Sequence, residues 1–160
     1  MITAQRTGAG ILTVVAPLDG SDKAERVMPA AIEESLLHGA PLVLLHVVPF
    51  AETPPGPRTA GPEGMCAATP PVEIEDDCGR ADRYLREVLE RRGVQGGEVV
   101  VRYGDPVSQI AAELRRWPRP LAVLASYATA VLPVGPHSEI ARRLMALNEF
   151  HVLTVPNPPE

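Results

Sequence analysis

Five short apolar segments, separated by longer stretches with helical periodicity, constrain the fold of this 160-residue chain more than any other feature. Short runs rich in Val, Leu and Ile are typical of strands that are buried on both faces of a sheet. We predict strands at residues 11–16, 42–48, 98–103, 121–125 and 152–155. The spacing of apolar residues between them predicts helices at residues 22–38, 76–92, 106–116 and 140–147.

The alternation of strands with helices predicts an α/β fold with a doubly wound, open, five-stranded parallel sheet and helices on both faces. In such folds, ligands bind beyond the carboxyl ends of the strands, where the strand order reverses. Those ends fall at residues 17–21, 47–49 and 126–128. We therefore expect any binding site to lie at this edge of the sheet.

Several helix boundaries carry local signals. Ser21 or Asp22 is expected to cap the first helix, and Gly39 is expected to end it. Pro29 lies inside that predicted helix, where its missing N–H predicts a kink. Asp105 followed by Pro106 is typical of a cap and the first residue of a helix.

Proline is frequent, with 18 residues, and six of them lie within residues 50–72. That stretch lacks hydrophobic periodicity and is predicted to form one long loop. A chain of this length is typical of one domain. We expect that domain at residues 11–156, loop included, with an N-terminal extension at 1–10 and a C-terminal tail at 157–160.

The net charge and the cysteine content limit the classes of binding partner and the cellular compartment that we expect for this protein. A net charge of −5 argues against a nucleic-acid partner, and no apolar run is long enough to span a membrane. The N-terminus lacks the pattern of a secretory signal, so we expect a cytoplasmic protein. Cys66 and Cys78 are then expected to remain unpaired thiols, and no metal site is expected.

Sequence motifs exclude several enzyme classes. The turn after the first strand lacks the glycines of a dinucleotide-binding site, and Lys23, the sole lysine, does not lie in a phosphate-loop motif. The G-x-S-x-G motif of a serine hydrolase and the H-E-x-x-H motif of a zinc protease are both missing. The third and fifth strands also lack the aspartate and the lysine that a receiver domain needs at their ends.

Six short motifs, in this order, resemble the universal stress protein family. They read VAPLDGSDKA at residues 15–24, LLHVV at 44–48, YGDPVSQI at 103–110, AVLAS at 122–126, IARRL at 140–144 and VLTVP at 152–156. The resemblance covers nearly the whole chain apart from the proline-rich loop. It implies the strand order 3-2-1-4-5 of the adenine nucleotide alpha hydrolase-like fold, a flavodoxin-like three-layer sandwich, and a homodimer formed through the last strand.

ATP-binding members of that family carry G-x2-G-x9-G-[ST] after the fourth strand, and the glycines let backbone N–H groups approach the phosphates. The corresponding positions here are Ala125, Ala128, Ser138 and Glu139. All three glycines are replaced, and a register shift of one residue restores none of them. The resemblance therefore implies a degenerate ATP motif in which the Glu139 carboxylate repels a triphosphate.

The resemblance also implies a candidate nucleoside pocket. Its remaining positions are Pro17, Leu18, Asp19, Val47, Leu124 and Ile140. Asp19 would lie near the ribose and adenine, although an aspartate that bonds its own turn explains the position equally well. Val47 would lie beside the base, although a role in the core is the favoured interpretation of this residue.

Histidines offer weaker signals of chemistry. His46 lies in an apolar strand and is interpreted as a core or rim residue whose ring nitrogens are satisfied, in preference to a ligand. His137, Ser138 and Glu139 are adjacent in sequence. Catalysis by them is disfavoured, because catalytic triads are defined by convergence in space and not by sequence proximity.

We therefore predict a non-enzymatic stress-response or regulatory domain that forms a homodimer and binds a partner protein or small ligand through the strand ends and the loop at 50–72. The candidate dimer interface is Val152, Leu153, Thr154 and Val155, a weakly charged segment that would risk aggregation if left unpaired. No cofactor is expected, and ATP or AMP is disfavoured. Two alternatives stay open: a member that binds or hydrolyses nucleotide through an atypical loop, and a purely structural dimerisation module.

Overall fold

A computed structural model describes residues 10–49, 71–126 and 136–156, and ten helices and strands lie within these ranges. The strands are β1 (Thr13–Pro17), β2 (Leu42–Val48), β3 (Glu98–Tyr103), β4 (Pro120–Ser126) and β5 (His151–Pro156). The helices are α1 (Asp22–Glu25), α2 (Met28–His38), α3 (Pro71–Arg91), α4 (Pro106–Arg116) and α5 (Pro136–Ala146).

The five strands form one sheet in the order β3-β2-β1-β4-β5, and every neighbouring pair is parallel. Strand order reverses at β1, which pairs with β2 on one side and with β4 on the other. The prediction of a doubly wound parallel sheet in this order is confirmed. The reversal places the carboxyl ends of β1, β2 and β4 side by side.

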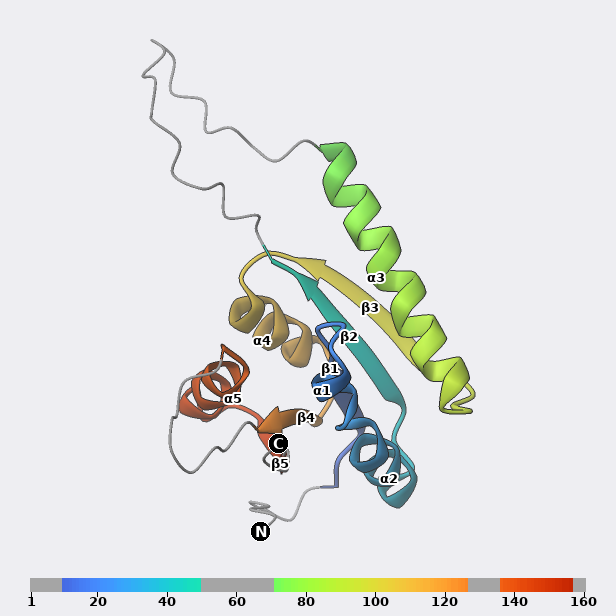
Figure 1. Ribbon diagram of the computed structural model, residues 1–160. Helices are drawn as coiled ribbons and strands as arrows, with labels where there is room; N and C mark the ends of the chain where they lie inside the picture. Colours follow the sequence, from blue (N-terminus) through green and yellow to red (C-terminus); the bar gives the residue numbers. More distant parts are fainter. Residues whose placement is uncertain (1–9, 50–70, 127–135, 157–160) are drawn as a thin grey trace.

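Helices cover both faces of the sheet (Figure 1). Side chains of α1, α2 and α3 pack against one face in a cluster that includes Val14, Leu44 and Val123. Side chains of α4 and α5 pack against the other face with Val15, Leu45 and Leu124. Residues adjacent in a strand therefore enter different layers, as expected for strands buried on both faces.

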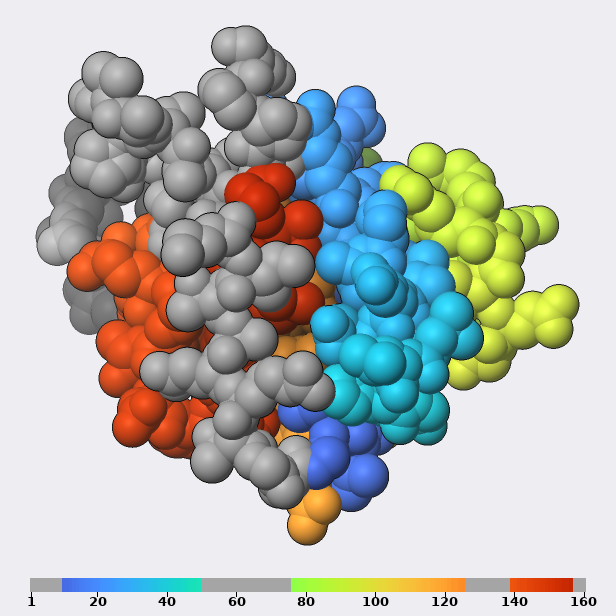
Figure 2. All heavy atoms as spheres, turned by 90° about the horizontal axis from the view of Figure 1, so that it is seen from below, coloured from blue at the N-terminus to red at the C-terminus, as the bar shows by residue number. Residues whose placement is uncertain are grey.

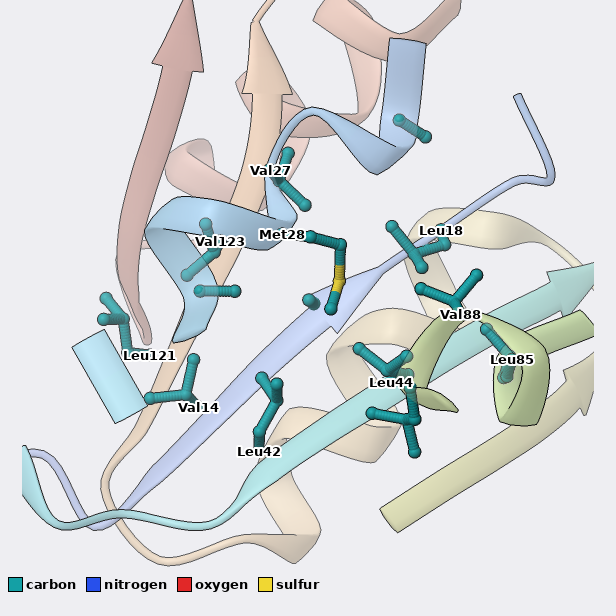
Figure 3. Close-up of a cluster of buried hydrophobic side chains, with 14 of the residues drawn as sticks. Val14, Leu18, Val27, Met28, Leu42, Leu44, Leu85, Val88, Leu121 and Val123 are labelled. Carbon is teal, nitrogen blue, oxygen red and sulfur yellow. The ribbon is translucent and has the colours of Figure 1, made fainter. Parts of the chain in front are cut away.

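The hydrophobic cluster under α1, α2 and α3 contains side chains from segments that are far apart in the sequence. Figure 3 shows Met28 surrounded by side chains from β1, β2 and α3. Met28, Leu44 and Leu85 are fully buried. Burial of each such side chain contributes about 1.5–3 kcal/mol, so this layer is a main source of stability.

Three predicted helices have different boundaries in the structure. The predicted helix at 22–38 is two helices, because the chain breaks between α1 and α2 and Pro29 lies in the first turn of α2. A proline is tolerated there because the first-turn N–H groups have no partner within the helix. Helix α3 begins at Pro71, so the predicted loop at 50–72 gives way to helix two residues early, and α5 begins at Pro136 instead of residue 140.

The predicted caps are confirmed. The Ser21 side chain accepts a hydrogen bond from the backbone N–H of Ala24, and Asp105 accepts one from the backbone N–H of Ser108. Gly39 ends α2 in the left-handed conformation, with φ of 58°, which glycine adopts without steric cost.

Some sequence predictions fall outside the described residues. These are the extension before residue 10, the loop at 50–70, the tail after residue 156, Cys66 and Ala128. Cys78 lies half-buried on α3. Within the described ranges, no helix has both the length and the apolar character needed to cross a membrane.

Candidate functional site

A cavity of about 280 Å³ lies at the carboxyl ends of β1, β2 and β4, beside the first turns of α4 and α5. Its volume is close to the lower limit of about 300 Å³ for small-molecule sites. The residues that line it are Pro17, Leu18, Asp19, Ala24, His46, Val47, Pro49, Pro106, Ile110, Leu124, Ala125 and Ile140. Nearly all of these side chains are apolar.

The end of β1 supplies one wall. After β1 ends at Pro17, the backbone N–H of Leu18 still donates to the carbonyl of Leu45 at 2.8 Å, which keeps the chain beside β2. Asp19 then accepts hydrogen bonds at Oδ1 from the backbone N–H and the hydroxyl of Ser21, at 2.9 and 2.6 Å. Asp19 therefore bonds its own turn, as the first interpretation of this residue predicts, and also lies in the cavity wall, as the nucleoside-pocket interpretation predicts.

Helix α4 supplies a second wall through Pro106 and Ile110. Its start is closed by Asp105, whose Oδ2 accepts from the backbone N–H and the hydroxyl of Ser108 at 2.9 and 2.8 Å. These two hydrogen bonds, first the backbone one, hold the pKa of Asp105 below its ordinary value. The carboxylate thus takes up donors that an anion would otherwise find at this helix terminus.

Helix α5 approaches the cavity with Ile140, whereas the preceding Glu139 is exposed and absent from the described lining. Glu139 forms an ion pair with Arg142, whose Nη2 lies 2.7 Å from Oε2 and also 2.7 Å from Oε1. The acidic group lies in the first turn, where it is favourable to the helix dipole. Ser138 belongs to α5, but its side chain lies outside the described residues.

His46 is the main polar side chain of the inner wall. Its Nδ1 is buried and has no hydrogen-bond partner in the described part of the chain, so the prediction of a satisfied ring is wrong for this one nitrogen. Burial lowers the pKa of His46 below 6.5, and this outweighs the opposing effects of the Leu18 backbone and the Asp19 charge. The imidazole is therefore neutral at pH 7.

A buried polar network lies directly behind His46. The His46 and Tyr84 rings meet edge to face, with centroids 6.3 Å apart and an interplanar angle of 75°. The Tyr84 hydroxyl donates to Glu25 Oε1 at 3.0 Å, and Arg91 Nη2 donates to the same oxygen at 3.1 Å. Burial, followed by the bond to Glu25, raises the pKa of Tyr84. These contacts tie α3 to α1 and hold the His46 ring in place.

Acidic groups dominate the electrostatics of this edge. Asp19 lies before α1, Asp105 caps α4, and Glu139 lies in the first turn of α5. Among the described lining residues there is no Lys or Arg. No group of three or more His, Cys, Asp or Glu in the described ranges is arranged to hold a metal ion. The described residues therefore provide a largely apolar cavity whose described lining holds one carboxylate and no cationic side chain.

The structure brings seven of the ten sequence-predicted pocket residues to this one cavity: Pro17, Leu18, Asp19, Val47, Leu124, Ala125 and Ile140. Glu139 lies outside it, and the side chains of Ala128 and Ser138 are not described. Sequence reasoning did not assign Ala24, His46, Pro49, Pro106 or Ile110 to the site. The only available signal for these was their position at a strand end or on the inward face of a helix.

Known proteins similar to this chain share the architecture. A universal stress protein family member from Burkholderia pseudomallei is 22% identical with a TM-score of 0.63, covering 94% of this chain and all of that one. UspA from Lactobacillus plantarum is 18% identical with a TM-score of 0.65, over 92% of this chain and 99% of that one. A universal stress protein in complex with cAMP is 18% identical with a TM-score of 0.58, over 92% and 98% of the two chains.

At these identities the structural matches establish a shared adenine nucleotide alpha hydrolase-like fold. No curated protein matches the chain with significance. The sequence profile of the Universal stress protein family, however, matches residues 10–126, well over half of the chain. Together with the sheet order and the cavity at the strand ends, this match shows that the chain belongs to the universal stress protein family.

Proposed function

We propose that this chain is a non-enzymatic regulatory domain of the stress response whose strand-end cavity does not hold ATP tightly. The observation that carries the proposal is the set of acidic residues at this edge: Asp105 caps α4, Glu139 lies in the first turn of α5, and Asp19 lies two residues before the Ser21 cap of α1. Helix N-termini are the usual anion sites of such folds, because their N–H groups and dipole favour negative charge. Here the Asp105 carboxylate already accepts from such an N–H group at α4, and Asp19 and Glu139 add negative charge beside the starts of α1 and α5.

The electrostatic penalty for a triphosphate is large enough to matter. At an effective dielectric of about 20, two like charges 4 Å apart repel by about 4 kcal/mol, and about 1.4 kcal/mol corresponds to a tenfold change in affinity. Exposure and the Arg142 partner reduce the share that comes from Glu139. A remaining penalty of about 1.4–3 kcal/mol still weakens binding by about 10- to 150-fold.

Thermal unfolding with ATP, ADP or AMP tests this proposal. A ligand present at 100 times its dissociation constant stabilises by about 2.7 kcal/mol, or about 5–10 °C for a domain of this size. We expect no resolvable shift at millimolar ATP, and a gain of ATP affinity in Glu139→Ser relative to the matched surface variant Glu87→Ser. A saturable shift of several degrees with ATP, or stoichiometric nucleotide in extracts of the purified protein, would contradict the proposal.

A second candidate is a nucleotide-binding member that uses an atypical phosphate loop. One similar solved structure is described as a complex with cAMP, and the cavity here lies at the strand ends where nucleotides bind in such folds. In the same thermal assay, a saturable shift with AMP or cAMP would favour this function over the first.

We also propose that the protein acts as a homodimer through β5. This strand lies at the edge of the sheet, pairs with β4, and is only half-buried at most of its residues. Figure 2 shows β5 reaching the surface between α5 and the segment that carries α1 and α2. Unpaired strand edges of low charge favour pairing with a second chain.

Light scattering coupled to size exclusion tests the dimer. Wild type and Glu98→Lys, a charge change at the opposite edge strand β3, are expected to give twice the monomer mass. Thr154→Lys introduces a cation into the proposed contact and is expected to give a monomer. A monomeric wild type, or a Thr154→Lys dimer as stable as that of wild type, would refute assembly through β5.

A further inference from the structure

We propose that residues 19–26 open as a unit while the rest of the domain stays folded. The buried carboxylate of Glu25 is the latch that keeps this segment closed against α3. The segment contains α1, and its Ala24 side chain lines the strand-end cavity, so opening removes part of the cavity wall. The inference goes beyond the proposed function, because it concerns access to the cavity and holds whatever the cavity binds.

Few apolar contacts hold residues 19–26 to the rest of the domain. Buried anchors lie on either side of them: Leu18 is 3% exposed and Val27 is 0% exposed. Between these anchors, where every residue is described, Ala24 is the only buried apolar side chain, and an alanine buries little apolar surface. The charged side chains of the segment other than Glu25 are exposed, where ion pairs stabilise little. The segment is therefore held much less firmly by apolar burial than the strands and helices around it.

The backbone of this segment is separable from its neighbours. Gly20 has φ of +88°, a left-handed conformation that glycine adopts freely, and at the other end the helix breaks between α1 and α2. Helix α1 is a single turn of four residues. The backbone N–H of Glu25 donates to the Ser21 carbonyl, and that of Val27 donates to the Ala24 carbonyl, both at 3.2 Å. Opening of this one turn leaves the hydrogen bonds within α2 and the sheet in place.

Glu25 supplies the buried polar contact between the segment and α3. Its side chain is 10% exposed, and its Oε1 accepts from the Tyr84 hydroxyl at 3.0 Å and from Arg91 Nη2 at 3.1 Å. Arg92 Nη2 lies 4.0 Å from the other oxygen, Oε2. Tyr84 and Arg91 are two helical turns apart, so one face of α3 presents both donors to the carboxylate. Hydrogen bonds to an ionised group are the stronger kind, so this contact sets how often the segment opens.

The latch depends on charge and is therefore sensitive to salt. The Arg91 and Arg92 side chains are 58% and 36% exposed, so dissolved ions screen their attraction for Glu25. Apolar burial at the anchors Leu18 and Val27 is not screened in this way. The closed state is therefore expected to weaken as the ionic strength rises, while the anchors on both sides stay in place.

Native-state amide hydrogen exchange, followed by NMR, tests the opening in the wild-type protein. The reporters are the amides of Ala24 and Val27, which donate to Ser21 Oγ and to the Ala24 carbonyl. The amide of Leu44, in a central strand, reports unfolding of the whole domain. We expect the reporters to exchange at least about 100-fold faster than Leu44, because local opening requires less free energy than global unfolding. Reporters that are as well protected as Leu44 would overturn the proposal.

Glu25→Gln tests the latch, because it keeps the shape of the side chain and removes its charge. We expect exchange at Ala24 and Val27 to become about tenfold faster. In wild type, about 1 M sodium chloride, which shortens the screening length to about 3 Å, should speed the same amides about two- to fivefold. Glu25→Gln should lose this salt response. Unchanged exchange in Glu25→Gln, or an undiminished salt response, would show that Glu25 does not hold the segment closed.

Two further variants complete the test. Arg91→Met removes one donor from the α3 side at an exposed position, and it should speed the exchange of Ala24 and Val27 about threefold. Glu34→Gln is the matched control, because its carboxylate pairs with His38 within α2. It should leave the exchange of both reporter amides as in wild type. An equal acceleration in Glu34→Gln would show a general loss of charge and would overturn the assignment of the latch.

Discussion

Removal of the buried carboxylate of Glu113 should destabilise the fold far more than any surface charge change. Glu113 lies on α4 with a side chain that is 1% exposed. Its Oε2 accepts from Nε and Nη2 of Arg102 at 2.8 and 2.6 Å, and from Arg116 at 3.4 Å. Its Oε1 accepts from the indole N–H of Trp117 at 3.0 Å. One carboxylate thus joins β3, α4 and the chain that leads to β4.

The substitution Glu113→Gln keeps the shape of the side chain and removes its negative charge, so it measures the contribution of the carboxylate to stability. A carboxylate accepts on both oxygens, whereas an amide must turn its NH2 group toward either the guanidinium of Arg102 or the indole N–H of Trp117. The loss of one charge-assisted hydrogen bond costs about 1.5–3 kcal/mol, and a donor left unsatisfied adds about 1–3 kcal/mol. Arg102 is 34% exposed and can recover water contacts, so we expect a total near 3 kcal/mol, the lower end for a broken buried pair.

Urea unfolding followed by Trp117 fluorescence measures this cost, since Trp117 is the sole tryptophan and lies in the network. With a slope of about 2 kcal/mol per M, a loss of about 3 kcal/mol lowers the midpoint by about 1.5 M without a change in slope. The variant should still fold, because domains of this kind have about 5–15 kcal/mol of stability.

Two controls separate the network from a general loss of charge. Glu87→Gln, on the exposed side of α3, should change stability by less than about 0.5 kcal/mol. A double-mutant cycle of Glu113→Gln with Arg102→Met should give a coupling of about 1–3 kcal/mol. If Glu113→Gln loses less than about 0.5 kcal/mol, or if the cycle is additive, the carboxylate does not hold these elements together as described.

Three further predictions address other parts of the fold. The folded-state pKa of His46 lies below 6.5, so as pH falls the unfolded chain takes up this proton first. The contribution of His46 to stability is therefore complete above pH 6.5 and declines as the pH drops below that value. As the pH is lowered, the urea midpoint of His46→Phe should fall less steeply than that of wild type. An identical slope would argue against a buried neutral imidazole. Gly104→Ala should cost about 1–2 kcal/mol in a urea titration, because φ is +140° there and a Cβ would meet a side-chain nitrogen at 3.0 Å. The helical control Gly79→Ala, which has open space around it, should instead gain about 0.5–1 kcal/mol. Tyr84→Phe should cost about 1 kcal/mol by removing the hydrogen bond to Glu25, and a neutral result would show that Arg91 and Arg92 satisfy that carboxylate without the tyrosine.

Local patterns in the sequence predicted most of the secondary structure. The segment at 42–48 forms β2 with the predicted bounds, and the caps Ser21 and Asp105 act as expected. These features depend on residues within a few positions of one another, so hydrophobic periodicity and capping chemistry are enough to identify them. The strand order came from the family resemblance, because parallel alternation alone is compatible with several orders.

The sequence was enough to predict those residues of the candidate site that lie at the carboxyl ends of strands. Leu18, Val47 and Leu124 come to the cavity because the carboxyl ends of parallel strands meet at one edge of a sheet. Glu139 did not follow this rule. A helix turns by about 100° per residue, so Glu139 does not share the position of Ile140 in the cavity wall; it is exposed beside the cavity and pairs with Arg142.

The order of residues along the chain was enough to predict the alternation of strands and helices, their caps and the edge of the sheet where a site can form. Which polar side chains are buried, and what they contact, became known from the folded structure. No local pattern marks Glu113 or Glu25 as buried, yet both are buried in the structure and each is paired with an arginine from another element. The unsatisfied nitrogen of His46 is likewise a property of what packs around it. Burial and partnership depend on contacts between residues far apart in the chain, and local periodicity does not carry that information.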